Sequence, residues 1–180
     1  MKFSWYDSKI GRILLVGDEA GLSHLLFESG KHFQTHGISP DWQENPAPFK
    51  QCIQQLNEYF DGERKQFDVS LNLSGTEFQR RVWEELTRIE YGQTISYAEL
   101  ANRIGQPGAS RAVGSANGKN PISIVIPCHR VIGSGGKLAG YSGGLSNKLS
   151  LLQLEGLQVH GTDDAARATV GTRQQQLQFS

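Results

Sequence analysis

One cysteine stands in a setting that could make it a nucleophile. Cys128 follows a short apolar run and a proline, and His129 and Arg130 come directly after it. Positive charge beside a thiol lowers its pKa and raises the fraction of thiolate, which is the nucleophilic form. Pro127 restricts the backbone and helps to orient the next side chain. The sequence therefore predicts an exposed, reactive thiol at position 128, whereas a lone cysteine taken by itself favours a buried structural role.

A carboxylate on the last predicted helix could complete a catalytic set. Glu155 lies three residues after Leu152, on the apolar face of that helix, and an inward-facing carboxylate needs a partner. His129 is a suitable one: Glu155 would hold the imidazole, and His129 would take the thiol proton of Cys128 directly or through a water. The alternative is a helix-end glutamate in solvent. On these residues alone, a cysteine hydrolase is a fair rival.

The region around these residues predicts mostly helices. Two capping-box patterns, Thr76 with Gln79 and Ser96 with Glu99, each indicate the start of a helix. A third short helix is expected over 109–117. The second and third helices, joined by a tight turn that contains glycine, have the outline of a helix-turn-helix.

The elements that flank Cys128 complete this half. The apolar run 122–126 indicates buried extended chain, and a final helix is expected over 145–155. Between them, 133–144 holds six glycines in twelve positions without a phosphate-binding pattern, which favours a mobile loop or wing. From 159 the pattern vanishes, and we expect a loosely held tail.

The first 73 residues predict a small domain of strands and one helix. Aliphatic and aromatic runs at 3–6, 12–16 and 22–28 indicate strands, and apolar residues at helical spacing indicate a helix from 49 to 60. Cys52 lies beside that stripe, and we expect it to be a small core residue.

Composition limits the class of protein. The chain has 180 residues, of which 37% are hydrophobic and 20% charged, enough for one domain or two small ones. No apolar run is long enough for a transmembrane helix, the first residues lack the apolar core of a signal peptide, and two cysteines make no disulfide framework. No cysteine or histidine pair has metal-ligand spacing. We expect a cytoplasmic protein without metal or cofactor.

Charge is distributed unevenly along the chain. The net charge is zero, but 1–70 holds seven basic and ten acidic residues, a net −3, whereas 91–150 holds six basic residues against Glu99 alone, a net +5. Such asymmetry indicates a nucleic-acid-binding face, and a plain solvated surface is the commoner alternative.

A longer set of residues around Cys128 resembles the O6-alkylguanine-DNA alkyltransferase family. The resemblance runs from about Thr76 to Gly156, in the family's order and spacing. It is carried by Arg111-Ala112-Val113-Gly114-Ser115-Ala116-Asn117, Gly118-Lys119-Asn120-Pro121, Ile126-Pro127-Cys128-His129-Arg130-Val131-Ile132 and Gly140-Tyr141-Ser142-Gly143-Gly144.

The resemblance implies an α+β fold in three parts. Residues 1–73 would form a small RNase H-like domain of sheet and helix. Residues 74–158 would form a mostly helical DNA-binding alkyltransferase domain with a winged helix-turn-helix and the active-site cysteine, and 159–180 the loosely ordered tail.

The implied activity is DNA repair by a methylated-DNA–protein-cysteine methyltransferase. Such a protein flips O6-alkylguanine, and also O4-alkylthymine, out of duplex DNA and transfers the alkyl group irreversibly to its own cysteine, once per molecule. The expected partner is double-stranded DNA bound through the minor groove by a monomer that could act cooperatively, with no membrane involved. A non-catalytic helix-turn-helix protein that binds lesions or regulates transcription is the alternative, although relatives that only bind lack the cysteine found at position 128.

The resemblance also implies a role for each matching residue. Cys128 matches the alkyl acceptor, His129 and Glu155 the water-linked proton relay, and Asn120 the buried amide that ties the recognition element to the active-site turn. Arg111 matches the finger that fills the gap left by the flipped base, and Tyr97 the residue beside the 3′ phosphate. The remaining matches are the pocket residues Val131, Tyr141 and Ser142 and the DNA-backbone contacts Gln79, Gln106 and Ser134. Some relatives hold zinc in the first domain, but this chain lacks the cysteines for that site.

Overall fold

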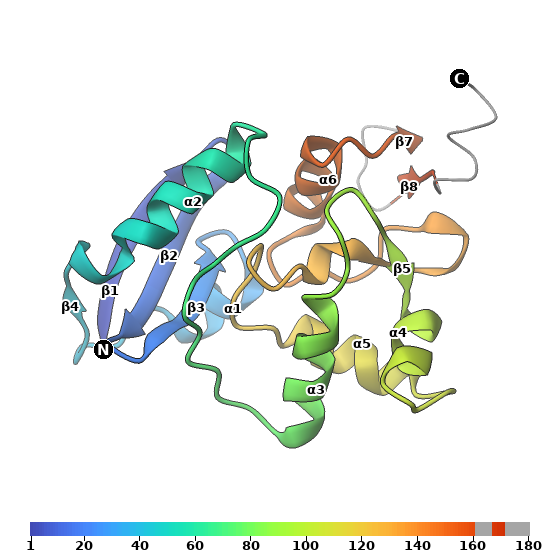
Figure 1. Cartoon of the computed structure of the whole chain (residues 1–180), viewed down its shortest axis with the longest axis horizontal. Helices are drawn as coiled ribbons and strands as arrows, with labels where there is room; N and C mark the ends of the chain where they lie inside the picture. The colour runs from blue at the N-terminus through green and yellow to red at the C-terminus, as the bar shows by residue number, and fades with distance from the viewer. Residues whose placement is uncertain (161–166, 172–180) are drawn as a thin grey trace.

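The computed structural model describes residues 1–160 and 167–171 and has two parts, a sheet covered by a long helix and a cluster of shorter helices (Figure 1). The elements are, in chain order, β1 (Lys2–Ser8), β2 (Gly11–Asp18), β3 (Gly21–Phe27), α1 (Lys31–His36), β4 (Gln43–Glu44), η1 (Ala47–Phe49), α2 (Lys50–Phe60), α3 (Glu77–Leu86), β5 (Ile95–Ser96), α4 (Tyr97–Arg103), α5 (Ser110–Gly118), η2 (Cys128–Arg130), β6 (Val131–Ile132), η3 (Ser134–Gly136), α6 (Leu145–Leu154), β7 (Val159–His160) and β8 (Thr169–Val170).

The first part is a four-stranded sheet in the order β3-β2-β1-β4. Strands β1, β2 and β3 are antiparallel, and the short β4 pairs in parallel with β1. Helix α2 packs on the sheet through its buried face: the ring of Phe60 stacks on Tyr6, and the Tyr6 hydroxyl donates to Asn57 at 2.9 Å. Cys52 is buried on the same helix, as expected, and burial raises its pKa to about 12.

The two parts share one core. Leu25 of β3 bonds through its backbone to Pro121 and Ser123, at 2.9 and 3.0 Å. Buried residues of α2 and of α3 belong to the same apolar cluster. The sheet therefore supports the chain that leads into Cys128.

The capping boxes give the helices their starts. Thr76 Oγ1 accepts from the Gln79 amide at 3.2 Å, and Gln79 Oε1 accepts from the Thr76 amide at 2.9 Å. Ser96 caps α4 by accepting from the Glu99 amide at 3.1 Å. The indole of Trp83 then donates to the Ala116 carbonyl at 2.9 Å, which joins α3 to α5.

The apolar run 122–126 is a turn and not the extended segment that its composition predicts. The Ile126 amide donates to the Ile122 carbonyl at 3.0 Å, and Ile124 has a φ of 70°. The side chain of Asn120 supplies a donor and an acceptor to this turn. The run can be buried because the Asn120 amide and the backbone of Leu25 in β3 together bond to its backbone groups.

Two short elements, α1 and β4, lie where the sequence predicts only a loop. Helix α1 has no buried residue, so it lacks the apolar stripe from which a helix is recognised.

The expected loose tail is ordered where the structure describes it. Strand β7 pairs with β8, and Ala168 and Val170 are buried against Ile132 and Leu138. The Leu138 amide donates to the Ala168 carbonyl at 3.3 Å. The rest of the expected tail, 161–166 and 172–180, lies outside the described residues.

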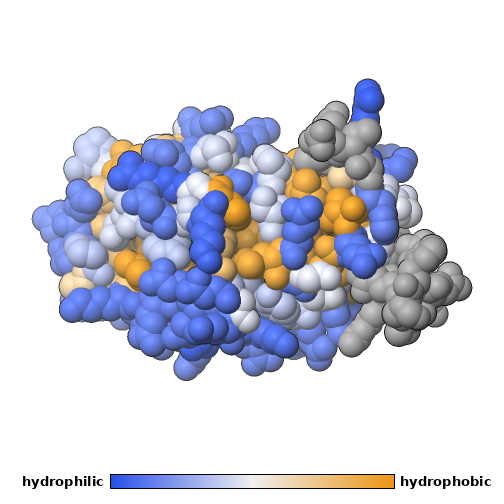
Figure 2. Space-filling view, turned by 90° about the horizontal axis from the view of Figure 1, so that it is seen from above, coloured by the Kyte–Doolittle hydropathy of each residue, from blue (hydrophilic) through white to orange (hydrophobic). Residues whose placement is uncertain are grey.

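Most of the surface is polar. Seen from above, hydrophilic residues surround smaller hydrophobic patches (Figure 2). Within the described ranges, Met1 is the one large hydrophobic residue that is exposed, and no helix combines the length and apolar character needed to cross a bilayer.

Candidate active site

Cys128 lies at the start of the 3-10 turn η2 and is 1% exposed. The prediction of an exposed thiol is wrong, because the turn at 122–126 carries the chain back into the core. Burial raises the pKa of Cys128 to about 11, while a hydrogen bond from Asn120 and the positive charge of Lys148 lower it. The thiol is thus kept protonated by its surroundings, with two groups placed to stabilise the thiolate.

Asn120, which lies just after α5, bonds to the turn that leads to Cys128. Its Nδ2 donates to Cys128 Sγ at 3.0 Å and to the Ile126 carbonyl at 2.8 Å, and its Oδ1 accepts from the Ile122 amide at 3.0 Å. The side chain is fully buried. One amide therefore fixes both the shape of the turn and a donor on the sulfur.

Glu155, the C-cap of α6, is the centre of a buried polar cluster. Its Oε1 lies 2.8 Å from His129 Nε2 and accepts from the Tyr59 hydroxyl at 2.7 Å, and its Oε2 accepts from the Gly92 amide at 3.1 Å. Arg130 donates to both oxygens. Burial acts to raise the pKa of Glu155, but His129 and Arg130 hold it well below its ordinary value, so the carboxylate is charged.

His129 is completely buried, and burial lowers its pKa despite the opposing charge of Glu155. The imidazole is therefore neutral at neutral pH. Since Nε2–H donates to the Glu155 carboxylate, Nδ1 is the basic nitrogen, and it has no protein partner among the described residues. The described residues show no direct hydrogen bond between His129 and the Cys128 thiol, which favours the water-linked of the two expected routes.

The sequence predicts that Arg130 lowers the pKa of the Cys128 thiol, but its side chain bonds elsewhere. Its Nε lies 3.0 Å from Glu155 Oε2, and its Nη1 donates to the Ile89 carbonyl at 2.5 Å. Its charge is therefore paired with Glu155, and it does not contribute to the pKa of Cys128.

Lys148 supplies the positive charge near the sulfur, and sequence reasoning missed it. Its Nζ is buried and donates to the carbonyls of Val131 and Ala139, at 2.6 and 2.8 Å. Burial lowers its pKa to about 8, and the neighbouring Cys128 opposes that shift. The signal was available: Lys148 precedes Leu152 by four residues, on the same apolar face that pointed to Glu155.

A cavity of about 540 Å³ is lined by Tyr97 and Tyr141, which pack against the buried cluster that contains Cys128. Gly114 and Ser142 also line it, and we call it the Tyr97–Tyr141 cavity. Burial, and next the charge of Cys128, raise the pKa of Tyr97 to about 12 and that of Tyr141 above its ordinary value. The volume lies within the range of small-molecule sites, about 300–1,000 Å³.

The pairing of two short strands positions Tyr97 and the residues that follow Cys128. Strand β5 pairs in parallel with β6, Ile95 opposite Val131, so α4 starts beside the residues that follow Cys128. The Tyr97 hydroxyl then donates to the Ala139 carbonyl at 3.1 Å. Val131, expected to offer its carbonyl to a ligand, accepts from Lys148 with that oxygen.

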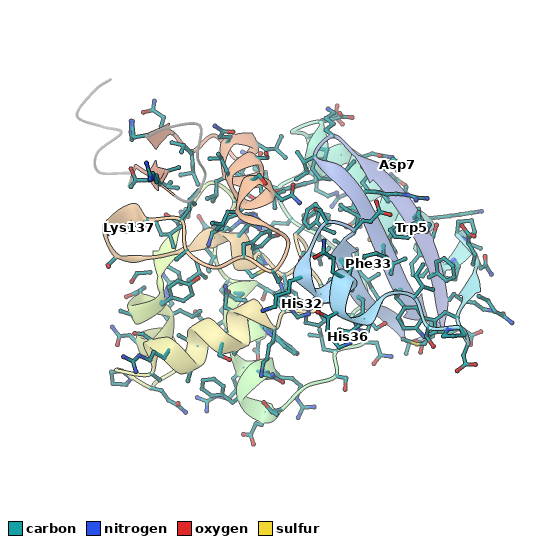
Figure 3. All side chains as sticks on the ribbon, turned by 180° about the vertical axis from the view of Figure 1, so that it is seen from behind. Trp5, Asp7, His32, Phe33, His36 and Lys137 are labelled. Carbon is teal, nitrogen blue, oxygen red and sulfur yellow. The ribbon has the colours of Figure 1, made fainter. Side chains whose placement is uncertain are left out.

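The other expected contact residues lie around the outside. Arg111 is exposed in the first turn of α5, Gln106 is exposed between α4 and α5, and Ser134 is exposed in η3. Gln79 uses its side-chain oxygen in the capping box of α3. Seen from behind, α5, α1 and the glycine-rich loop with Lys137 appear on one face (Figure 3).

Helix α1 forms a third side of the cavity that sequence reasoning did not anticipate. His32 Nε2 donates to the Gly118 carbonyl at the end of α5, at 2.7 Å, and the Lys31 amide donates to the Ser142 carbonyl at 2.8 Å. The first part of the chain thereby reaches the mouth of the cavity.

Family models match both parts of the chain. The 6-O-methylguanine DNA methyltransferase ribonuclease-like domain matches residues 1–73, and the DNA binding domain of the same family matches 77–157.

Relatives agree with this match. The chain is 51% identical over 156 residues to the methylated-DNA–protein-cysteine methyltransferase of Methanosarcina acetivorans, covering 87% of this chain and 99% of the relative. It is 51% identical over 151 residues to the protein of that name from Mycobacterium tuberculosis strain H37Rv, covering 83% and 88%.

The fold agrees as well. The crystal structure of Mycobacterium tuberculosis OGT in complex with DNA superposes with a TM-score of 0.80 at 48% identity, covering 86% of this chain and 92% of that one. With both halves matched by its models and relatives covered over most of their length, the chain belongs to the 6-O-methylguanine DNA methyltransferase family.

Proposed function

We propose that Cys128 accepts the alkyl group of O6-alkylguanine, and of O4-alkylthymine, from double-stranded DNA in one irreversible transfer. The observation that supports this most strongly is that Cys128, whose Sγ accepts from Asn120 at 3.0 Å, shares the turn η2 with His129 and belongs to the buried cluster against which Tyr97 and Tyr141 pack. His129 in turn bonds to Glu155, and both tyrosines line the Tyr97–Tyr141 cavity. Sγ attacks the alkyl carbon, an S–C bond forms, and the C–O6 bond breaks. The thiol proton ends on the released guanine. Because a thioether has no easy route back, each molecule acts once.

The relay explains how a buried thiol can react. Neutral His129 takes the thiol proton at Nδ1 through a water, and Glu155 stabilises the imidazolium that forms. The Asn120 donor and the Lys148 charge stabilise the thiolate. The proton held by His129 is then delivered to the guanine, which leaves with O6 still attached as the C–O6 bond breaks.

DNA recognition follows from the same geometry. A base alkylated at O6 cannot be reached inside the stack and must be flipped, at a cost of a few kcal/mol. Helices α4 and α5 act as the helix-turn-helix, with the glycine-rich loop as its wing, and the domain 74–158 approaches the minor groove. Arg111 fills the space left by the base, Tyr97 crowds the adjacent phosphate, and Gln79, Gln106 and Ser134 contact the backbone.

The first domain, 1–73, is the scaffold in this proposal. Its parallel β4 beside three antiparallel strands supports the RNase H-like class. Acceptor, relay and cavity all come from one chain, so a monomer carries out the transfer.

Mass spectrometry tests the proposal. After incubation with duplex DNA containing O6-methylguanine, the peptide with Cys128 should gain one methylene permanently and stoichiometrically. Absence of an adduct despite DNA binding would identify a lesion-binding protein, and turnover beyond one equivalent would identify a cysteine hydrolase. Cys128→Ser should retain DNA binding and lose transfer, and loss of both would assign the thiol a structural role only.

A further inference from the structure

We propose that α1 provides a second contact to DNA: Lys31 and His36, together with Lys119, bind the backbone phosphate of the flipped nucleotide at the mouth of the Tyr97–Tyr141 cavity. This inference rests on the proposed function, and it assigns the first part of the chain a role in binding as well as support.

The charge of the cavity mouth is the first observation. Lys31 and His36 of α1 line it from one side, and Lys119, just after α5, from the other. All three are exposed, and His32 between them is half-buried. The residues that line the cavity include no aspartate or glutamate. The mouth is therefore a cationic surface without an internal counter-charge.

The basic character of α1 contrasts with the net negative charge of the domain to which it belongs. The first 70 residues carry a net charge of −3, yet α1, with the sequence Lys-His-Phe-Gln-Thr-His, has no acidic residue. A helix that only supported the core would not need basic residues in a domain that is otherwise acidic.

The position of α1 is fixed relative to the cavity walls. His32 donates to Gly118 at 2.7 Å, and the backbone of Lys31 donates to Ser142 at 2.8 Å. Gly30 makes this approach possible, because a Cβ there would lie 2.9 Å from the Ser142 carbonyl oxygen. Helix α1, which carries His32 and His36, is thus anchored both to the end of α5 and to the loop that contains Ser142 (Figure 3).

The covalent structure of a nucleotide indicates that a phosphate would lie at the mouth of the cavity. When the base fills the cavity, its sugar stays at the entrance, and the phosphates attached to that sugar must lie at the mouth. Lysine binds phosphate as a point charge, and histidine donates through a ring nitrogen. The residues present at the mouth are those that a phosphate diester requires.

The test compares binding to DNA with reaction of a free base. In a Cys128→Ser background, Lys31→Gln and the double variant Lys31→Gln/His36→Gln are titrated with duplex DNA containing O6-methylguanine at several salt concentrations. We expect weaker binding, and a slope of log K against log salt that is less steep by about 0.9 for Lys31→Gln and by more in the double variant. With Cys128 intact, both variants should lose more of their rate with duplex DNA than with free O6-benzylguanine, since the free base has no phosphate.

Lys50→Gln is the matched control, because Lys50 is exposed on α2 and does not line the cavity. Affinity and salt slope equal to those of Lys50→Gln in both α1 variants would overturn the proposal. Equal losses with DNA and with the free base would also overturn it, because they would indicate damage to the cavity itself. If wild-type protein forms no adduct, the proposed function fails instead, and the two failures are distinguished.

Discussion

His129 Nε2 lies 2.8 Å from Oε1 of Glu155, and both side chains are removed from solvent. This single contact fixes the tautomer of the imidazole and turns its basic nitrogen away from the carboxylate. The same carboxylate also holds Arg130 and Tyr59, so the relay is part of the structural framework. Changes here are expected to affect stability and reactivity together.

Glu155→Gln should destabilise the protein strongly. It leaves the buried Arg130 guanidinium without its counter-charge, and breaking a buried pair costs about 3–5 kcal/mol. Chemical denaturation measures the loss. Tyr59→Phe is the control, because it removes one hydrogen bond to the same charged carboxylate and should cost less, about 1.5–3 kcal/mol. Equal effects of the two substitutions would contradict a dominant role for the ion pair.

Stability should also fall in acid because of Glu155. Its pKa in the folded protein is below the ordinary 4.5, so the folded state binds fewer protons than the unfolded state below that pH. The contribution is complete above about pH 4.5 and is lost as pH falls toward the folded pKa. Unfolding free energies measured from pH 6 down to pH 3 should therefore drop more steeply in wild type than in Glu155→Gln. Parallel curves would show that other groups cause the acid loss.

Much of the site was predictable from local pattern, and the exceptions share a cause. The apolar periodicity of the last helix pointed to Glu155, and the capping box at Thr76 and Gln79 located the start of α3. Burial of Cys128 and the turn at 122–126 were not predictable, because the turn depends on side-chain hydrogen bonds of Asn120 and on pairing with Leu25, which lies about 100 residues earlier in the chain.

Contacts between residues far apart in the sequence could not be predicted either. Tyr59 meets Glu155 across 96 residues, and α1 reaches the cavity although it carries no apolar stripe. Lys148 differs, since its place on the apolar face of α6 was visible in the sequence.

The transfer rate should keep its full value at mildly acidic pH. Burial lowers the pKa of His129 from its ordinary 6.5, so the neutral base persists below that pH. In a plot of the single-turnover rate with free O6-benzylguanine against pH, the fall toward acid pH should therefore be centred below pH 6.5. A fall centred at or above pH 6.5 would contradict the assignment of His129 as the neutral base.

Lys148→Met should make the thiol less acidic. The substitution removes the cation that lowers the pKa of Cys128, and it leaves the carbonyls of Val131 and Ala139 without their donor, at about 1–3 kcal/mol each. The rate of thiol alkylation by iodoacetamide as a function of pH reports the shift. Lys137→Met, at an exposed position of the glycine-rich loop, should leave the profile unchanged.

Arg111→Ala should slow transfer from duplex DNA far more than transfer from free O6-benzylguanine. A side chain that occupies the vacated stack contributes about 1–3 kcal/mol only when a duplex is present. Rates with the two substrates, measured in parallel, provide the comparison. Equal losses would refute the finger role.

Val170→Ala should loosen the glycine-rich loop. Val170 is buried against that loop, and full burial of a valine contributes about 1.5–3 kcal/mol. Hydrogen exchange at the Leu138 amide, which bonds to Ala168, should become faster. Gln158→Ala, at an exposed position next to β7, is the control and should leave exchange at Leu138 as in wild type.

The arrangement around Glu155 has a consequence for biosynthesis. Its partners Tyr59, Gly92, His129 and Arg130 all leave the ribosome before it does. Until α6 has emerged, the guanidinium of Arg130 lacks its carboxylate partner and has only the Ile89 carbonyl as an acceptor, and the sheet can fold only beside an incomplete second part. A nascent chain therefore carries Cys128 and His129 before it carries Glu155, and the buried cluster around that carboxylate can assemble only after α6 has emerged.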